Sequence, residues 1–430
     1  MRFLIFMVAF AITIGIGMPI APSLIILSTF YCMFTGMSLA MMSINMFSGM
    51  TSFVLIAIPL FILTAEIMDR TQVTDKLFGF CKDLVGYIPG GLGHVNCVTS
   101  VIFAGMSGAA VADVGGIGHL CYSEMVRAGY DKNFSGSVTM ASSLIGPIIP
   151  PSIPIIIYAM CTNTSAGRLL IGGLLPGFIM GAALMIWVYI VSKKRNFPYM
   201  KMPSWRVYLK SLGRSFLRAI PALMTAVILL AAIYTGIVTS TEAAALAALY
   251  ALILGVFLYR TLSLKGFVDA LVSVFKKCGT TLLLIAAGKA FGFVLTNEGI
   301  QMKLTKLFYQ ISGGNKWGIL VLCLLLFLIL GCVSDSTVNI MLFSSMVASI
   351  MTGVGFDPIH VGILIVLCAM LGNITPPVGA VLMGVCSMEK LKVHEVTKEL
   401  VPPILILIAV MAFIAVVPGT ATFLPSLIME

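Results

Sequence analysis

Long apolar stretches with almost no charge are the feature that most constrains this chain. Residues 133–167, for example, contain no charged side chain. A segment that crosses a bilayer needs roughly 20 apolar residues, with every backbone group hydrogen-bonded inside the segment. Only 10% of the 430 residues are charged, whereas a soluble domain carries about 25% charged residues. The chain is therefore predicted to be an all-α polytopic membrane protein. The composition excludes a soluble globular enzyme, a disordered chain and a nucleic-acid binder.

The net charge of +10 gathers between the apolar stretches. Residues 193–218 contain basic side chains and no acid. The positive-inside rule places them in the cytoplasm, either as a basic amphipathic helix at the lipid surface or as a linker. Residues 3–65 carry no charge, so we expect a retained first span and not a cleaved signal peptide. The scattered cysteines show no C-x-x-C spacing, and we expect no cofactor.

Two of the apolar stretches are interrupted by glycine and proline. Pro147, Pro150 and Pro151 cannot continue an α-helix, because proline lacks an N–H and clashes with the preceding turn. Residues 372–379 repeat the pattern. Each interruption follows two short apolar segments that meet at small polar residues. These patterns predict two re-entrant hairpins and two discontinuous helices, with irregular backbone covered by protein or by a polar cavity.

One offset of 226 residues aligns the two halves. It pairs Gly105 with Gly331, Gly129-Tyr130-Asp131 with Gly355-Phe356-Asp357, Gly136 with Gly362, Gly146 with Gly372, Pro150-Pro151 with Pro376-Pro377, and Pro176 with Pro402. Matching broken segments in two halves indicate a secondary transporter built from two inverted repeats.

The predicted first repeat covers residues 1–205 and the second covers residues 206–430. The elements expected in the first repeat are scaffold spans at about 1–70, an arm helix at 74–88, a hairpin at 92–126, a broken helix at 134–160, a span at 169–192 and the basic linker at 193–218. Those expected in the second repeat are scaffold spans at about 219–259, an arm helix at 263–277, a span at 279–297, a hairpin at 317–352, a broken helix at 358–388 and a last span at 400–418.

A helix break frees carbonyl groups, which suit Na⁺, and N–H groups, which suit an anionic substrate. The candidate Na⁺ and substrate residues lie at the hairpin tips and the breaks: Ser107, Gly108, Asp113, Gly146, Pro147, Pro150, Pro151, Gly331, Ser334, Asp335, Thr337, Gly372, Asn373, Thr375 and Pro376. Ionisable groups inside a membrane are functional candidates, but each aspartate could instead cap the second helix of its hairpin. We favour a cap or another structural role for Asp113 and a functional role for Asp335.

Other polar groups leave alternatives open. We expect Glu66 to be interfacial, whereas Lys289 lies mid-span and could pair with an acid, contact an anion or reach the interface. The spacing Gly105-x-Ser107 resembles the nucleophile motif of intramembrane serine proteases, with His119 as a conceivable base. The chain contains no G-x-x-x-x-G-K-[ST] loop, so we expect that it does not itself power transport by ATP.

The run from Phe103 to Asp113, followed by Gly129-Tyr130-Asp131 and by residues 146–152, resembles the large membrane subunit of tripartite ATP-independent periplasmic (TRAP) transporters. Asp335, Gly355-Phe356-Asp357-Pro358 and residues 375–379 resemble the same family in the second half. The resemblance covers essentially the whole chain, in order.

The resemblance implies a Na⁺-driven importer of the elevator type in the bacterial inner membrane. The hairpins and broken helices would form a mobile domain, with one Na⁺ site at each hairpin and break. A small four-helix membrane subunit would widen the scaffold. A periplasmic substrate-binding protein would deliver a small carboxylate substrate. A self-sufficient ion-coupled carboxylate carrier is the alternative.

Overall fold

The computed structural model describes residues 6, 8–10, 12–13, 16–71, 73–332 and 334–429. Every regular element among these residues is helical, as predicted. Part of the expected first span lies outside the described residues. The elements of the first half are α2 (Ile20–Thr35), α3 (Leu39–Met50), η1 (Phe53–Ile56), α4 (Ala57–Arg70), α5 (Val73–Val85), α6 (Gly91–Ser107), α7 (Ala110–Asp113), the π-helical turn η2 (Val114–Gly118), α8 (His119–Arg127), α9 (Lys132–Ser143), α10 (Ile153–Thr162) and α11 (Ala166–Arg195).

The second half repeats this order of long, short and interrupted helices. Its elements are α12 (Trp205–Tyr234), α13 (Ser240–Ile253), the π-helical turn η3 (Leu254–Leu258), α14 (Leu264–Asn297), α15 (Ile300–Ser312), α16 (Lys316–Gly331), α17 (Ser336–Gly353), α18 (Pro358–Gly372), α19 (Ala380–Met388), α20 (Val393–Val416) and α21 (Gly419–Ile428).

Six helices in the described part of the chain are long and apolar enough to cross a membrane, and a seventh span is possible if α3 and α4 are counted as one bent pair. The six are α11, α12, α13 with η3, α14, α17 and α20. The shorter apolar helices include α10, α16 and α18, which are the pieces of the predicted hairpins and broken helices. The polytopic helical architecture is therefore confirmed.

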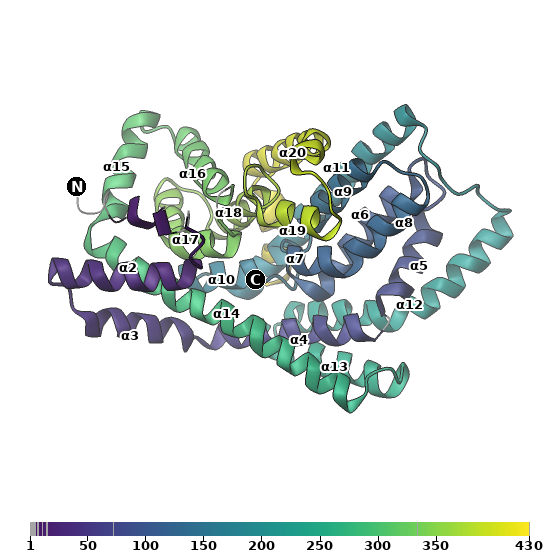
Figure 1. The fold of residues 1–430 in the computed structure, drawn as a ribbon, viewed down its shortest axis with the longest axis horizontal. Coiled ribbons are helices and arrows are strands. Elements are labelled where there is room, and N and C mark those ends of the chain that lie inside the picture. Colours follow the sequence, from purple (N-terminus) through teal and green to yellow (C-terminus); the bar gives the residue numbers. More distant parts are fainter. Residues whose placement is uncertain are drawn as a thin grey trace.

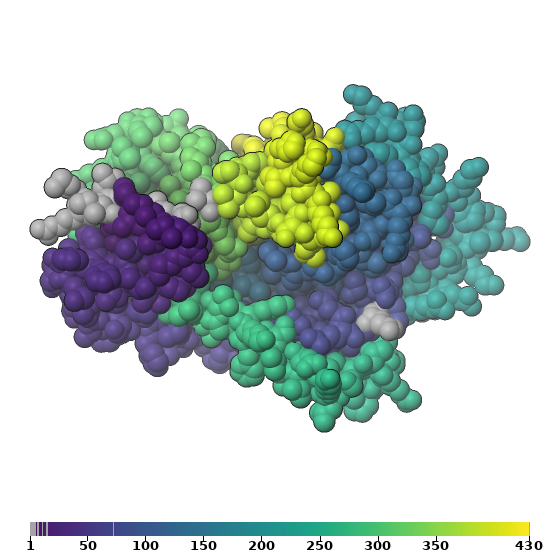
Figure 2. Space-filling model, in the orientation of Figure 1, coloured from purple at the N-terminus to yellow at the C-terminus, as the bar shows by residue number. Residues whose placement is uncertain are grey.

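The helices form two groups (Figure 1). We call α2–α5 and α12–α14 the scaffold, because α14 packs along α2, α3 and α4, while α12 and α13 pack on α5 and α4. The hairpin group contains both hairpins and both broken helices, with α11, α20 and α21 packed around them. In the space-filling view of this face, the yellow C-terminal part of the chain lies between the blue first hairpin and the light-green second hairpin (Figure 2).

Both interruptions occur where proline and glycine predict them. The chain leaves helix α9 after Ser143 and resumes a helix at Ile153, and it leaves α18 after Gly372 and resumes at Ala380. The bonds between Pro150 and Pro151 and between Pro376 and Pro377 are both cis. Each broken helix packs on the hairpin of its own half, α9 on α6 and α18 on α16.

One predicted boundary is wrong. The arm helix at 263–277 and the span at 279–297 form one continuous helix, α14. This boundary followed a change in charge, but lysine is a good helix former and does not end a helix. The basic segment at 193–218 contains the end of α11, an irregular segment and the first half of α12. The structure also adds a final helix, α21, that was not predicted.

The second hairpin and the second break meet through two glycines. A Cβ atom on Gly331 would lie 2.8 Å from the Cα atom of Gly372, which is backbone and cannot move aside as a side chain can. Gly331 ends α16 and Gly372 ends α18, so this contact brings the hairpin tip against the break. In the second half, glycine at both positions therefore allows the close approach of the two backbones.

We predict that Gly331→Ala lowers the free energy of unfolding by roughly 1–3 kcal/mol, because the extra methyl group overpacks this contact. The measurement is thermal unfolding of the purified protein in detergent, followed by loss of the monodisperse elution peak. Gly384→Ala, on α19, is the matched control, because a Cβ atom there meets nothing within 4 Å. Equal melting temperatures for the two variants would contradict the close-approach argument.

Candidate functional site

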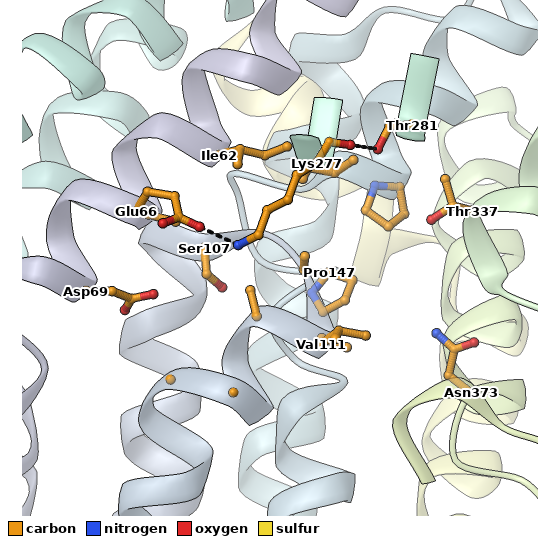
Figure 3. Close-up of a pocket in the computed structure, with 18 of the residues that line it drawn as sticks. Ile62, Glu66, Asp69, Ser107, Val111, Pro147, Lys277, Thr281, Thr337 and Asn373 are labelled. Carbon is orange, nitrogen blue, oxygen red and sulfur yellow. Dashed lines mark hydrogen bonds and ion pairs between the residues drawn. The ribbon is translucent and has the colours of Figure 1, made fainter. Parts of the chain in front are cut away.

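A cavity of about 990 Å³ lies between the scaffold and the hairpin group. Its lining includes residues from both hairpins and both breaks, together with residues of α4, α5 and α14. Figure 3 shows Glu66 and Asp69 on one side of the view and Thr337 and Asn373 on the other. The cavity is therefore the place where the two halves of the chain and the two groups of helices meet.

Each hairpin tip is joined to the break of its own half by a backbone hydrogen bond. The Ile153 N–H donates to the Gly108 carbonyl over 3.2 Å, and the Val378 N–H donates to the Cys332 carbonyl over 3.1 Å. Gly108 has a φ of +66°, a conformation that glycine adopts without a Cβ penalty. These bonds satisfy polar groups that the interrupted helices leave without an intrahelical partner.

Asp113 is buried between the first hairpin and the first break. It is the fourth residue of α7, and its side chain makes no capping hydrogen bond. The Ser107 hydroxyl donates to Asp113 Oδ1. Asp113 Oδ2 is buried without a hydrogen-bond partner in the protein. A Cβ atom on Gly146 would lie 2.5 Å from this oxygen, so the glycine keeps the space beside it open.

Asn373 occupies a comparable place in the second half. Its Nδ2 group donates to the Ser336 hydroxyl over 2.9 Å, which ties the break to the start of α17. Its Oδ1 atom is buried without a hydrogen-bond partner in the protein. Each half thus holds one buried side-chain oxygen with unused acceptor capacity beside its helix break.

Asp335 is the aspartate that does cap a helix. Its Oδ1 atom accepts from the Thr337 N–H over 2.8 Å at the start of α17. Asp335 also lines the cavity, so capping leaves it available to a ligand. Beside it, the Ser334 hydroxyl donates to Asn339 Oδ1 over 2.6 Å.

The predicted site residues fall into two groups, those that line the cavity and those that do not. Those that line it directly are Ser107, Pro147, Asp335, Thr337 and Asn373. Those that lie outside its lining, at the tips and the breaks, are Gly108, Asp113, Gly146, Pro150, Pro151, Gly331, Ser334, Gly372, Thr375 and Pro376. Thr375, for example, donates to the Leu371 carbonyl over 2.7 Å.

The sequence analysis did not predict the scaffold side of the cavity. Glu66 and Asp69 of α4 and Lys277, Thr280 and Thr281 of α14 all line it. Lys277 contacts Glu66 directly, as Figure 3 shows. Glu66 therefore lies at the cavity, with Lys277 as its partner. The sequence does show two acidic residues, Glu66 and Asp69, three positions apart at the end of an apolar segment. No repeat or motif, however, connects them with the residues of α14.

Two residues with open alternatives occupy other places. Lys289 lines a separate cavity of about 250 Å³ with Asn45 and Gln301. His119 Nδ1 lies 2.6 Å from Glu389 Oε1, while the Ser107 hydroxyl donates to Asp113. None of the described contacts joins His119 to Ser107, so these two residues do not form the nucleophile–base pair that a serine protease requires.

Similarity to known proteins identifies the family of this chain. The chain matches the family described as tripartite ATP-independent periplasmic transporter, DctM component, over residues 6–420. The chain belongs to this family. It is a multi-pass protein of the inner membrane and a transporter permease, not an enzyme.

Two relatives and one solved structure place the permease more closely. It is 37% identical to the sialic acid TRAP transporter large permease protein SiaM of Vibrio cholerae, over 96% of this chain and 95% of that protein. It is 31% identical to the C4-dicarboxylate TRAP transporter large permease protein DctM of Pseudomonas aeruginosa, over 92% and 91% of the two chains. The fold resembles the YdaH transporter of Alcanivorax borkumensis with a TM-score of 0.60, at 11% identity and 87% coverage of each chain.

We predict that a fluorophosphonate probe does not label Ser107 in the purified permease, because the hydroxyl is buried, donates to Asp113 and has no histidine or lysine among its described contacts. In-gel fluorescence of the wild type beside Ser107→Ala measures this. Labelling that disappears only in the variant would show a reactive serine and reopen the protease alternative.

Proposed function

We propose that this permease imports a small organic acid together with Na⁺, as the large subunit of a binding-protein-dependent transporter. The observation that carries the proposal is the cavity at the meeting point of both tips and both breaks, with an unpartnered buried oxygen beside each break. Na⁺ is a cargo in this scheme, and the structure contains no ion.

The two unpartnered oxygens support Na⁺ as the coupling ion. A buried acceptor without a donor costs about 1–3 kcal/mol, and an oxygen-coordinated cation at Asp113 Oδ2 or Asn373 Oδ1 would remove that cost. Hard cations prefer carboxylate, amide and carbonyl oxygens, and both places offer these groups. Each oxygen also lies beside a helix break, and the irregular segment of that break offers main-chain carbonyl groups as further ligands.

The charge of the cavity supports coupling of the anion to a cation. Its described lining contains the carboxyl groups of Glu66, Asp69, Asp75 and Asp335 but one basic side chain, Lys277. An anionic substrate entering such a site is repelled unless cations enter with it. Na⁺ bound at the breaks would therefore raise the affinity for the acid, which is the thermodynamic basis of symport.

Helix ends support an acid as substrate. The first residues of α10 and of α17 line the cavity, so the positive dipole ends of two helices would face an anion bound there. The relatives are named for sialic acid and for C4-dicarboxylates, and both are carboxylates. Sialic acid is the first substrate to test, because the relative with the higher identity of the two is named for it.

An elevator mechanism fits the grouping of the helices. The hairpins and broken helices pack on one another and share the cavity, while α4, α5 and α14 form the wall opposite them. A movement of the hairpin group against that wall would carry the cavity across the membrane as a unit. The proposed partners are a small four-helix membrane subunit and a periplasmic binding protein. The scaffold offers exposed apolar side chains on α12 and η3, such as Leu217 and Phe257, to lipid or to the small subunit.

We predict that sealed vesicles containing the permease, its small subunit and its binding protein accumulate sialic acid or succinate only under an inward Na⁺ gradient. Uptake of radiolabelled substrate measures this, with an equal K⁺ gradient as the control. Uptake that persists without Na⁺ would refute the coupling. Uptake without the binding protein would favour the self-sufficient carrier.

We also predict that Asp113→Asn and Asn373→Ala each raise the Na⁺ concentration for half-maximal uptake by about tenfold or more, since losing one charged or amide ligand removes about 1.4 kcal/mol of binding. The measurement is a Na⁺ titration of uptake, normalised to the amount of permease in the vesicles. Glu124→Gln is the matched control, because Glu124 lies on the first hairpin but pairs with Arg127 at the surface. A normal Na⁺ titration in both site variants would remove these residues from the ion sites.

A further inference from the structure

Lys277 occupies a special position in the cavity. It is the one basic side chain in the described lining, and it comes from scaffold helix α14, not from a hairpin or a break. Its side chain remains 54% exposed, so its ammonium group is accessible to a molecule in the cavity. Figure 3 shows it between the glutamate of α4 and the side chains of the hairpin group.

The Glu66 carboxylate pairs with this ammonium group, but it also has other partners. The Ser273 hydroxyl also donates to Glu66 Oε1 over 2.8 Å, and Arg70 Nε lies 3.7 Å from Glu66 Oε2. If Lys277 moved away, the largely buried Glu66 carboxylate would keep a hydroxyl donor and a cation. Solvent screens the exposed end of the Lys277–Glu66 pair. Lys277 can therefore change partner without leaving an unpaired charge behind.

We propose that Lys277 is the scaffold residue that contacts the carboxylate of the transported acid, and that Glu66 is its resting partner when the cavity is empty. A flexible four-carbon stem with three rotatable donors suits such an exchange. This inference rests on the proposed function and assigns to one residue part of its preference for acids. The contact would form while the hairpin group faces this part of α14, and it would be lost when the cavity moves past it.

A structural role for the same ion pair makes different predictions. If the pair only braced α4 against α14, removing either partner would have the same effect, a loss of folded permease or of maximal rate. If Lys277 binds the acid, the two substitutions act in opposite directions. Loss of Lys277 weakens substrate binding, whereas loss of the Glu66 charge frees the lysine and removes a competing carboxylate.

The experiment measures KM and maximal rate for sialic acid or succinate, whichever the wild-type complex takes up, in vesicles with equal amounts of permease. We expect Lys277→Gln to raise KM about tenfold or more, as for a lost charge-assisted hydrogen bond, with little change in the Na⁺ titration. Lys277→Arg keeps the charge and should stay within about threefold of wild type. Glu66→Gln should leave KM unchanged or lower it.

Lys276→Gln is the matched control. Lys276 is the adjacent residue on the same helix, it is exposed, and it does not line the cavity. The substitution removes the same charge, so a general effect of net charge on uptake would appear in both glutamine variants. An unchanged KM in Lys277→Gln, or equal losses in Lys277→Gln and Glu66→Gln, would overturn the inference.

A measurement on the wild-type complex covers the case in which Lys277→Gln does not fold. Reductive methylation of lysines, read by mass spectrometry, should be slower at Lys277 when the substrate and Na⁺ are present, and unchanged at Lys276. Equal methylation at Lys277 with and without substrate would also overturn it. If wild-type uptake ignores Na⁺ or both acids, the proposed function fails first; if wild-type uptake is normal and only these tests fail, only the role of Lys277 is wrong.

Discussion

The rest of this structure depends on the need to satisfy main-chain polar groups where a helix is broken among apolar neighbours. Water is scarce at that depth, so protein groups must supply the partners. In each half the tip of the hairpin does so, through Gly108 and Ile153 in one half and through Cys332 and Val378 in the other. These contacts fix each hairpin tip beside the break of its own half, and the cavity lies between the two pairs.

The cavity combines two kinds of wall with different chemistry. The hairpin side offers helix ends, small hydroxyl groups and the buried oxygens of Asp113 and Asn373. The scaffold side offers a charged network centred on Glu66. Because the breaks leave acceptor capacity unused and the lining is rich in carboxyl groups, the proposed cations would reduce the repulsion that the proposed substrate anion meets in the cavity.

Proline and glycine made the hairpins and the breaks predictable, because these residues act through the local backbone. The matching of Gly331 with Gly105 and of the proline pairs carried the prediction to both halves. The roles of Asp113 and Asp335 could not be read in this way, because capping depends on where the helix begins, and α17 begins one residue after Asp335. The contact between Glu66 and Lys277 joins residues far apart in sequence, so local pattern could not indicate it.

The continuity of α14 has a mechanical consequence. Its 34 residues make a helix about 51 Å long at 1.5 Å per residue, which contains the predicted arm helix and the predicted span without a hinge. A push on its outer end must therefore tilt the inner end as well. A lipid or a neighbouring protein that binds the outer end of α14 would therefore also move the part of α14 that lines the cavity.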